Sequence, residues 1–306
     1  MISTTHVRRW AAEAVDLGRD LVREWQEDRV GGLAAEVAFF GLLSLFPALL
    51  ATAAALGSLE AVAGGDVASR AEEEVIDFLR RVLTEEAAGT VDAVQDLFRT
   101  TDGGILTVGL VLALWTASRG FVALVRALDV VYDLDERRSY LRLRAVALGL
   151  AVGSVLVAAL MLAMLVLGPL LGTGRDVADA VGLGNGFAVM WNWLRWPVAA
   201  TVMVAWAATV LHLAPNHATP WRRDLPGALM AAATWAGVSV GLRAYLALAA
   251  GGNQVFGTLG GSLIVLLWLY LLGAGLLLGG ELNALLLVRG TAGPRSRAER
   301  GRAPAE

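Results

Sequence analysis

The chain has 306 residues, of which 57% are hydrophobic and 17% are charged, and its mean hydropathy is +0.61. Soluble domains are about 45 to 50% apolar, so this composition excludes an ordinary soluble protein. The absence of Cys excludes disulfides, thiolate metal sites and thiol catalysis, and the net charge of -3 averages a basic side with an acidic side and points to no partner.

Arginine occupies all 25 basic positions and is concentrated in alternate segments between six long apolar stretches. Five Arg precede the first stretch, six lie between the second and third, two between the fourth and fifth, and five follow the sixth. Residues 60–102, by contrast, hold eleven carboxylates and four Arg. Because short Arg-rich loops stay in the cytoplasm, the sequence predicts a plasma-membrane protein with six spans and both termini in the cytoplasm.

The amino-terminal segment, residues 1–32, is predicted to be a cytoplasmic amphipathic helix, because its apolar residues recur at helical spacing. These residues are Val7, Trp10, Ala14, Leu17, Leu21 and Trp25. The segment is either an interfacial anchor with its two Trp at the level of the lipid headgroups, or a cytosolic helix packed beneath the membrane domain.

Residues 33–288 are predicted to form an all-α membrane domain. Its spans cover about residues 33–59, 103–122, 145–171, 189–213, 226–249 and 256–288, and a bilayer requires roughly 20 residues per helix. We expect Pro47 to kink the first span, because Pro removes a backbone donor, and a hydroxyl such as that of Ser44 to satisfy the backbone group that is set free.

Two segments outside the spans complete the predicted organisation. Residues 60–102 contain two short amphipathic patterns separated near Gly89, which predict an acidic helical hairpin outside the membrane. Residues 289–306 are expected to form a disordered, Arg-rich cytoplasmic tail. The spans take about half of the chain, which leaves no room for a second globular domain.

Glycines four residues apart recur in the predicted spans. The pairs are Gly149 with Gly153, Gly237 with Gly241, Gly257 with Gly261, and Gly275 with Gly279. Small residues allow the close backbone approach by which helices associate in lipid. The pairs serve either packing within the monomer or a homo-oligomer, and the sequence does not choose between these two.

Patterns typical of an enzyme or a nucleic-acid-binding protein do not occur. The three His lack the spacing of a zinc protease helix, and the absence of Lys excludes a Walker-type phosphate loop. No aromatic-rich basic surface stands apart from the Arg that topology explains. We predict no catalytic residue, no cofactor and no metal, no nucleic-acid partner, and membrane lipids as the surrounding partner.

Six polar residues form the candidate functional cluster, because an ionisable group at the centre of a membrane helix costs roughly 2.5 to 3.5 kcal/mol and is therefore rare. They are Glu36, Ser44, Ser118, Arg119, Glu281 and Asn283. We expect Arg119 to pair with at least one of the two carboxylates. The cluster is either a salt-bridged clasp between three helices, or part of a polar pathway or a headgroup-binding site.

Four sequence blocks occur in a characteristic order. They are AAEVAFFGLLSLFP at 34–47; WTASRG at 115–120 with Tyr132 and ERR at 136–138; LAPN at 213–216 with Trp221 and LPGA at 225–228; and FGTLG at 256–260 with LWLY at 267–270 and GELNA at 280–284. Through these blocks, residues 25–290 resemble the YihY/BrkB family of bacterial inner-membrane proteins. The resemblance implies a six-helix plasma-membrane protein, some of whose relatives carry a ribonuclease or serum-resistance label and for which transport of lipid or envelope components is suggested.

Two functional hypotheses follow. The first is a transporter, or a protein that handles lipids or envelope components, without nuclease activity because a metal cluster of His and Asp is missing. The alternative is a membrane scaffold that does not transport and recruits partners through the outer hairpin or the amino-terminal helix. A water-accessible central cavity favours the first hypothesis, whereas a dry bundle with a large apolar outer patch favours the second.

Overall fold

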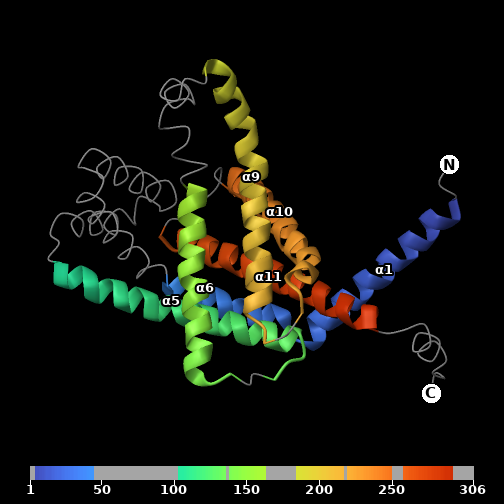
Figure 1. The fold of residues 1–306 in the computed structure, drawn as a ribbon, viewed down its shortest axis with the longest axis horizontal. Helices are drawn as coiled ribbons and strands as arrows, with labels where there is room; N and C mark the ends of the chain where they lie inside the picture. Colours follow the sequence, from blue (N-terminus) through green and yellow to red (C-terminus); the bar gives the residue numbers. More distant parts are fainter. Residues whose placement is uncertain are drawn as a thin grey trace.

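Figure 1 shows the computed structural model, which describes residues 4–44, 103–135, 138–162, 184–216, 219–249 and 258–291. Within these ranges the regular structure is helical, which confirms the predicted all-α fold class. The helices are α1 (Thr4–Glu27), an unlabelled helix at Val30–Ser44, α5 (Gly103–Val131), α6 (Tyr140–Leu162), α9 (Gly184–Leu213), the short 3-10 helix η3 (Trp221–Asp224), α10 (Leu225–Ala249) and α11 (Thr258–Thr291).

The described residues contain four helices that are long and apolar enough to cross a membrane. These segments are Tyr140–Ala158, Trp193–Leu213, Trp221–Tyr245 and Leu263–Gly290, and they fall on the last four predicted spans. Helix α5 covers the second predicted span and continues to Val131. Pro47 and the outer hairpin at 60–102 lie outside the described residues, so the count of six spans stays a prediction.

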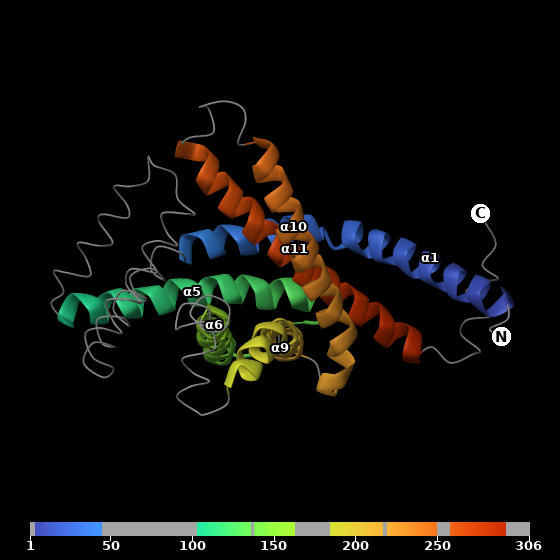
Figure 2. The same cartoon turned by 90° about the horizontal axis from the view of Figure 1, so that it is seen from above.

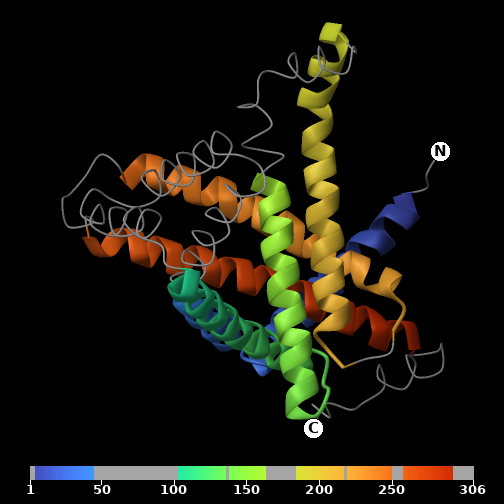
Figure 3. The ribbon, with the colours of Figure 1, turned by 60° about the vertical axis from the view of Figure 1, so that its left-hand side comes forward.

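The helices pack as crossing pairs. Helices α10 and α11 have the most extensive contact in the described part of the chain. Helix α5 runs beside the Val30–Ser44 helix, as Figure 2 shows, and α6 runs beside α9 in a direction that crosses the other pairs (Figure 3). Helix α1 reaches away from this bundle and contacts α11.

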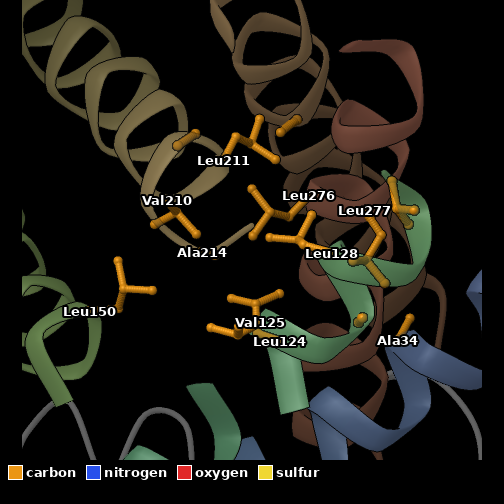
Figure 4. Packing of buried hydrophobic residues seen from close by; sticks show 14 of the residues in the cluster. Ala34, Leu124, Val125, Leu128, Leu150, Val210, Leu211, Ala214, Leu276 and Leu277 are labelled. Atoms are coloured by element: carbon orange, nitrogen blue, oxygen red, sulfur yellow. The ribbon is translucent and has the colours of Figure 1, made fainter. Parts of the chain in front are cut away.

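A core of Leu, Val and Ala lies where these pairs cross. Leu128 of α5, Leu211 of α9 and Leu277 of α11 are fully buried in it, together with Ala34 and the nearly buried Leu150 (Figure 4). Lipid is as apolar as these side chains, so close van der Waals packing, rather than removal of apolar surface from water, holds such a core together.

The outer surface of the bundle is itself apolar. The side chains of Leu156, Trp193, Val240 and Leu263 are all more than half exposed. Such a surface is expected where lipid takes the place of water as the solvent.

A break at Arg29 separates α1 from the Val30–Ser44 helix. Arg29 adopts a left-handed conformation with φ 53°, and its N–H donates to the carbonyl oxygen of Gln26 at 3.3 Å. A left-handed residue ends a helix because the chain changes direction there. The segment 1–32 was predicted to be one helix. In the structure, α1 ends at Glu27 and the first apolar helix begins at Val30.

The glycines of the small-residue pairs whose surroundings the structure describes fall into two groups. One group packs inside the monomer, with Gly153 against Trp206 and Gly279 against Gly227. The other group has no neighbour within 4 Å, and its members are Gly149, Gly237 and Gly241. The first group serves helix packing within the chain, while a homo-oligomer through the second group stays a prediction.

Candidate functional site

The six residues of the candidate cluster lie in separate environments. Glu281 and Asn283 of α11 are each 1% exposed. Glu36 and Arg119 are both exposed and line a different pocket, whereas Ser118 is buried because neighbouring residues on a helix point about 100° apart. Among the ion pairs and hydrogen bonds of the described residues, none joins Arg119 to Glu36 or Glu281.

Ser44 acts within its own helix. Its hydroxyl donates to the carbonyl oxygen of Phe40 at 2.7 Å, four residues earlier. Pro47 would set free the carbonyl group of Leu43, four residues before it, whereas the Ser44 hydroxyl binds the carbonyl group of Phe40. Pro47 lies outside the described residues, so its kink stays a prediction.

The larger cavity has a volume of about 780 Å³ and lies between α1, the turn after α5 and the end of α11. Its lining carries seven carboxylates and three Arg on an apolar base, and consists of Glu13, Asp16, Arg19, Asp20, Arg23, Glu24, Asp28, Val131, Asp133, Glu281, Ala284, Leu285, Val288 and Arg289. An ion pair of Arg289 with Asp20 ties α11 to α1. The Arg distribution places this cavity on the predicted cytoplasmic side.

Glu281 is the buried carboxylate of this cavity. Its Oε1 atom is buried and has no hydrogen-bond partner. Its carboxyl group lines the same cavity as that of Asp28, which lies in the turn after α1, and the two groups interact electrostatically. Partial burial, followed by the charge of Asp133, raises the pKa of Asp28 above its ordinary value. Asp28 therefore keeps its proton to a higher pH than an exposed Asp does.

Asp133 owes its position to the end of α5. It is left-handed with φ 52°, its N–H donates to the carbonyl oxygen of Val130 at 2.9 Å, and the N–H of Leu134 donates to that of Asp129 at 2.8 Å. These two bonds form a Schellman motif, in which Gly usually takes the left-handed position. The motif directs the Asp133 carboxylate into the lining of the cavity.

Asn283 joins three elements beside this cavity. Its Oδ1 accepts from the N–H of Gly227 at 2.7 Å, and its Nδ2 donates to the backbone oxygen of Asp224 at 3.1 Å. Gly227 lies in the first turn of α10, whose N–H groups have no partner within the helix. The side-chain Oδ2 of Asp224 lies 2.9 Å from Nδ1 of His212 on α9. Asn283 thus caps α10 from α11.

Like the Asn283 hydrogen bonds, the hydrogen bonds of Arg138 and Asp129 brace a helix end, in this case the end of α9. Arg138 donates to the backbone oxygens of Ala214 at 2.7 Å and Pro215 at 2.9 Å, and the N–H of Asn216 donates to Oδ1 of Asp129 at 3.2 Å. Cations at a helix C-terminus are favoured because its carbonyl groups carry partial negative charge.

Sequence reasoning did not select the braces as site residues. A signal existed for Asp129, which lies four residues after the core residue Val125 on the same face of α5. No comparable signal existed for Asp224, because it belongs to a charged loop that reads as solvated.

The smaller pocket has a volume of about 200 Å³ and lies between α5, the start of α6 and the Val30–Ser44 helix. Its lining is Glu36, Phe40, Arg119, Val122, Ala123, Arg126, Tyr140, Leu143 and Arg144. Arg144 donates to Oγ of Ser118 at 2.7 Å and to the hydroxyl of Tyr140 at 3.2 Å. Its guanidinium carbon lies 4.5 Å from the ring centroid of Trp115.

The described residues contain no group of three His, Cys, Asp or Glu placed to hold a metal ion. Their chemistry is that of buried hydrogen bonds, one buried carboxylate and two charged pockets. This arrangement can bind ions or head groups.

Comparisons with known proteins find a ribonuclease-like protein and several membrane proteins. The chain is 31% identical over 254 residues to a ribonuclease-like protein, YfkH, of Bacillus subtilis (strain 168). The aligned residues are 83% of this chain and 88% of that protein. It is 26% identical over 284 residues to a UPF0761 membrane protein of Stenotrophomonas maltophilia (strain R551-3), and these residues are 89% of this chain and 61% of that protein. A UPF0761 membrane protein of Alkalilimnicola ehrlichii is 27% identical over 281 residues, which are 90% of this chain and 59% of that protein.

No solved structure matches the chain. A family model, that of virulence factor BrkB, matches residues 21–304. This match includes both pockets except for the first part of α1, and it includes the caps at Asn283 and Arg138. The chain is therefore a membrane protein that belongs to the virulence factor BrkB family.

Proposed function

We propose that the protein is a plasma-membrane transporter that handles a lipid or another envelope component, and that the larger cavity is its cytoplasmic entrance. The observation that carries this proposal is the carboxylate of Glu281, which lies inside an apolar helix at the base of a cavity of about 780 Å³. Ionisable groups within membrane helices mark pathways for ions or substrates, because their burial is costly. The volume lies in the range of about 300 to 1,000 Å³ that is typical of small-molecule sites.

The lining charges favour a positively charged group on the transported molecule. Seven carboxylates and three Arg line the cavity, and two of these Arg, Arg23 and Arg289, already pair with acidic residues. A cationic group at the base would meet the Oε1 atom of Glu281, which lacks a partner. We further propose that the protein has no nuclease activity of its own, so that the ribonuclease-like name of one relative does not describe this chain.

Cysteine accessibility tests the proposal without knowledge of the substrate, because the chain contains no native Cys. Ala284 lines the cavity, whereas Leu277 is fully buried about two helical turns farther from the predicted cytoplasmic end of α11. A membrane-impermeant maleimide should label Ala284→Cys from the cytoplasmic side, in inside-out vesicles. It should label Leu277→Cys from the opposite side, in right-side-out vesicles, because a transporter must open this region outward in another state.

Leu211→Cys is the matched control, since Leu211 is equally buried in the core but belongs to α9, away from the cavity. A transporter predicts labelling of Leu277→Cys and none of Leu211→Cys. If neither becomes labelled, the bundle is sealed and the scaffold hypothesis is favoured. Equal labelling of both reports general loosening of the core and contradicts a defined pathway.

A further inference from the structure

The smaller pocket carries an excess of positive charge. Three Arg and one carboxylate line it, namely Arg119, Arg126, Arg144 and Glu36. Among the ion pairs of the described residues, none neutralises these guanidinium groups. The pocket is therefore electrostatically incomplete and favours an anion.

Arg144 is held in place before any ligand arrives. It donates to Ser118 and Tyr140, and its guanidinium carbon lies 4.5 Å from the ring centroid of Trp115 and 5.7 Å from that of Tyr140. Guanidinium groups stack on aromatic faces while their N–H groups stay available for phosphate. A fixed Arg loses less conformational entropy on binding than a free one.

The surroundings of the pocket are those of a lipid boundary. Trp115 is 52% exposed, Tyr140 62% and Leu141 77%, and the walls of the pocket include Val122 and Leu143. Trp and Tyr gather where a bilayer meets water. The pocket thus opens at the level where lipid headgroups lie, on the predicted cytoplasmic side.

We propose that this pocket binds the phosphate group of an anionic phospholipid of the cytoplasmic leaflet. Arg119 and Arg126 from α5 and Arg144 from α6 supply the donors, since Arg matches phosphate through paired N–H groups. Basic pockets between membrane helices on the cytoplasmic side are suited to such headgroups. The apolar walls, and the volume of about 200 Å³, suit a headgroup with the beginning of its acyl chains better than a free hydrated phosphate. This inference does not depend on the transport proposal.

Native mass spectrometry of the purified full chain tests the proposal. Palmitoyl-oleoyl-phosphatidylglycerol should bind more tightly than the zwitterionic phosphatidylcholine with the same acyl chains. Arg119→Gln combined with Arg126→Gln should weaken phosphatidylglycerol binding about 30-fold, given the typical contribution of one Arg near an anionic surface. Glu36→Gln should strengthen it, because the only carboxylate of this pocket lining is removed.

Arg222→Gln combined with Arg223→Gln is the matched control, because both Arg are exposed on η3 and lie outside this pocket. An equal loss of binding in this control would show that net charge alone attracts the lipid, which overturns the proposal, as would equal affinity for both lipids. Displacement of the lipid by millimolar inorganic phosphate would instead identify a free-phosphate site. Arg119→Lys keeps the charge without the paired donors, and its intermediate loss would separate phosphate recognition from misfolding.

Discussion

At the scale of single residues, Asn283 has the clearest structural task. It is 1% exposed and satisfies one backbone donor and one backbone acceptor on elements that precede it by more than fifty residues. A buried backbone group that loses its partner costs about 1 to 3 kcal/mol. The stability of the α10–α11 junction is therefore expected to depend on this amide.

Asn283→Ala should lower the free energy of unfolding by about 2 to 4 kcal/mol, because it leaves both backbone groups without a partner. Thermal unfolding of the detergent-purified protein, followed by the loss of helical circular dichroism, measures this change. Leu286→Ala on the same helix removes an exposed side chain and should have a much smaller effect. Equal effects of the two substitutions would contradict the capping role.

Asp28 predicts a specific pH dependence of stability. Its pKa is raised in the folded protein, first by partial burial and then by the charge of Asp133. As the pH rises from the ordinary pKa of Asp to this raised pKa, the unfolded chain has lost a proton that the folded chain keeps, so the free energy of unfolding falls. Above the raised pKa it should become constant.

Asp28→Asn should flatten this fall and give a higher stability than the native chain above the window. Unfolding temperatures measured across mildly acidic to neutral pH test the expectation. Asp16→Asn removes a carboxylate from the rim of the same cavity and serves as the control. If the two variants have the same pH profile, titration of Asp28 is not the cause.

At the scale of helices, α10 and α11 approach each other through glycine. A Cβ atom on Gly227 would overlap the carbonyl oxygen of Gly279 and the amide of Asn283, whereas a Cβ on Gly237 would meet open space. The same helix therefore offers one glycine that packing requires and one that it does not. The rule that small residues allow close approach of membrane helices can therefore be tested by comparing two glycines of one helix.

Gly227→Ala should destabilise the protein by about 1 to 3 kcal/mol, which is typical of overpacking. Gly237→Ala should stabilise it by up to about 1 kcal/mol, because Ala has the higher helix propensity. Thermal unfolding of the two variants gives both values. A destabilised Gly237→Ala variant that also runs at a smaller size in gel filtration would show that this face contacts a second copy, which contradicts its role as open space.

Helix boundaries were more predictable than helix partners. The predicted spans at 189–213 and 226–249 agree closely with α9, which ends at Leu213, and with α10, which covers Leu225–Ala249. Pro215 and Asn216 follow the end of α9, and the charged run at 222–224 precedes the start of α10. The break at Arg29 carried no such signal, because neither Gly nor Pro occupies the position.

The arrangement of the candidate site was less predictable for a physical reason. In lipid, every helix face is apolar, so hydropathy does not indicate which face meets which neighbour. Arg119 was expected to meet a carboxylate, whereas the neighbouring Ser118 turned out to be bound by Arg144 of α6. Glu281 was expected in the inner half of the last span, but the cavity that it lines with Asp28 depends on where α1 lies, which periodicity cannot give.

At the scale of the whole molecule, orientation in the membrane is the expectation that supports both proposals. Reporter fusions at Asp92, in the predicted outer hairpin, and at Glu306 should report opposite sides of the membrane. The reason is the positive-inside distribution of Arg. A fusion at Ser139, between α5 and α6, should report the same side as Glu306 and serves as the control. If Asp92 and Glu306 lie on one side, the six-span topology is wrong.

The ion pair of Arg289 with Asp20 has a consequence for folding during synthesis. Its two residues are 269 positions apart, so α1 emerges from the ribosome first and finds its partner last. Synthesis at about 5 to 20 residues per second leaves α1 undocked for tens of seconds, with its acidic face open to chaperones and proteases. This ion pair can therefore form only after Arg289 has been synthesised, and a chain that ends before Arg289 lacks the bond that ties the end of α11 to α1.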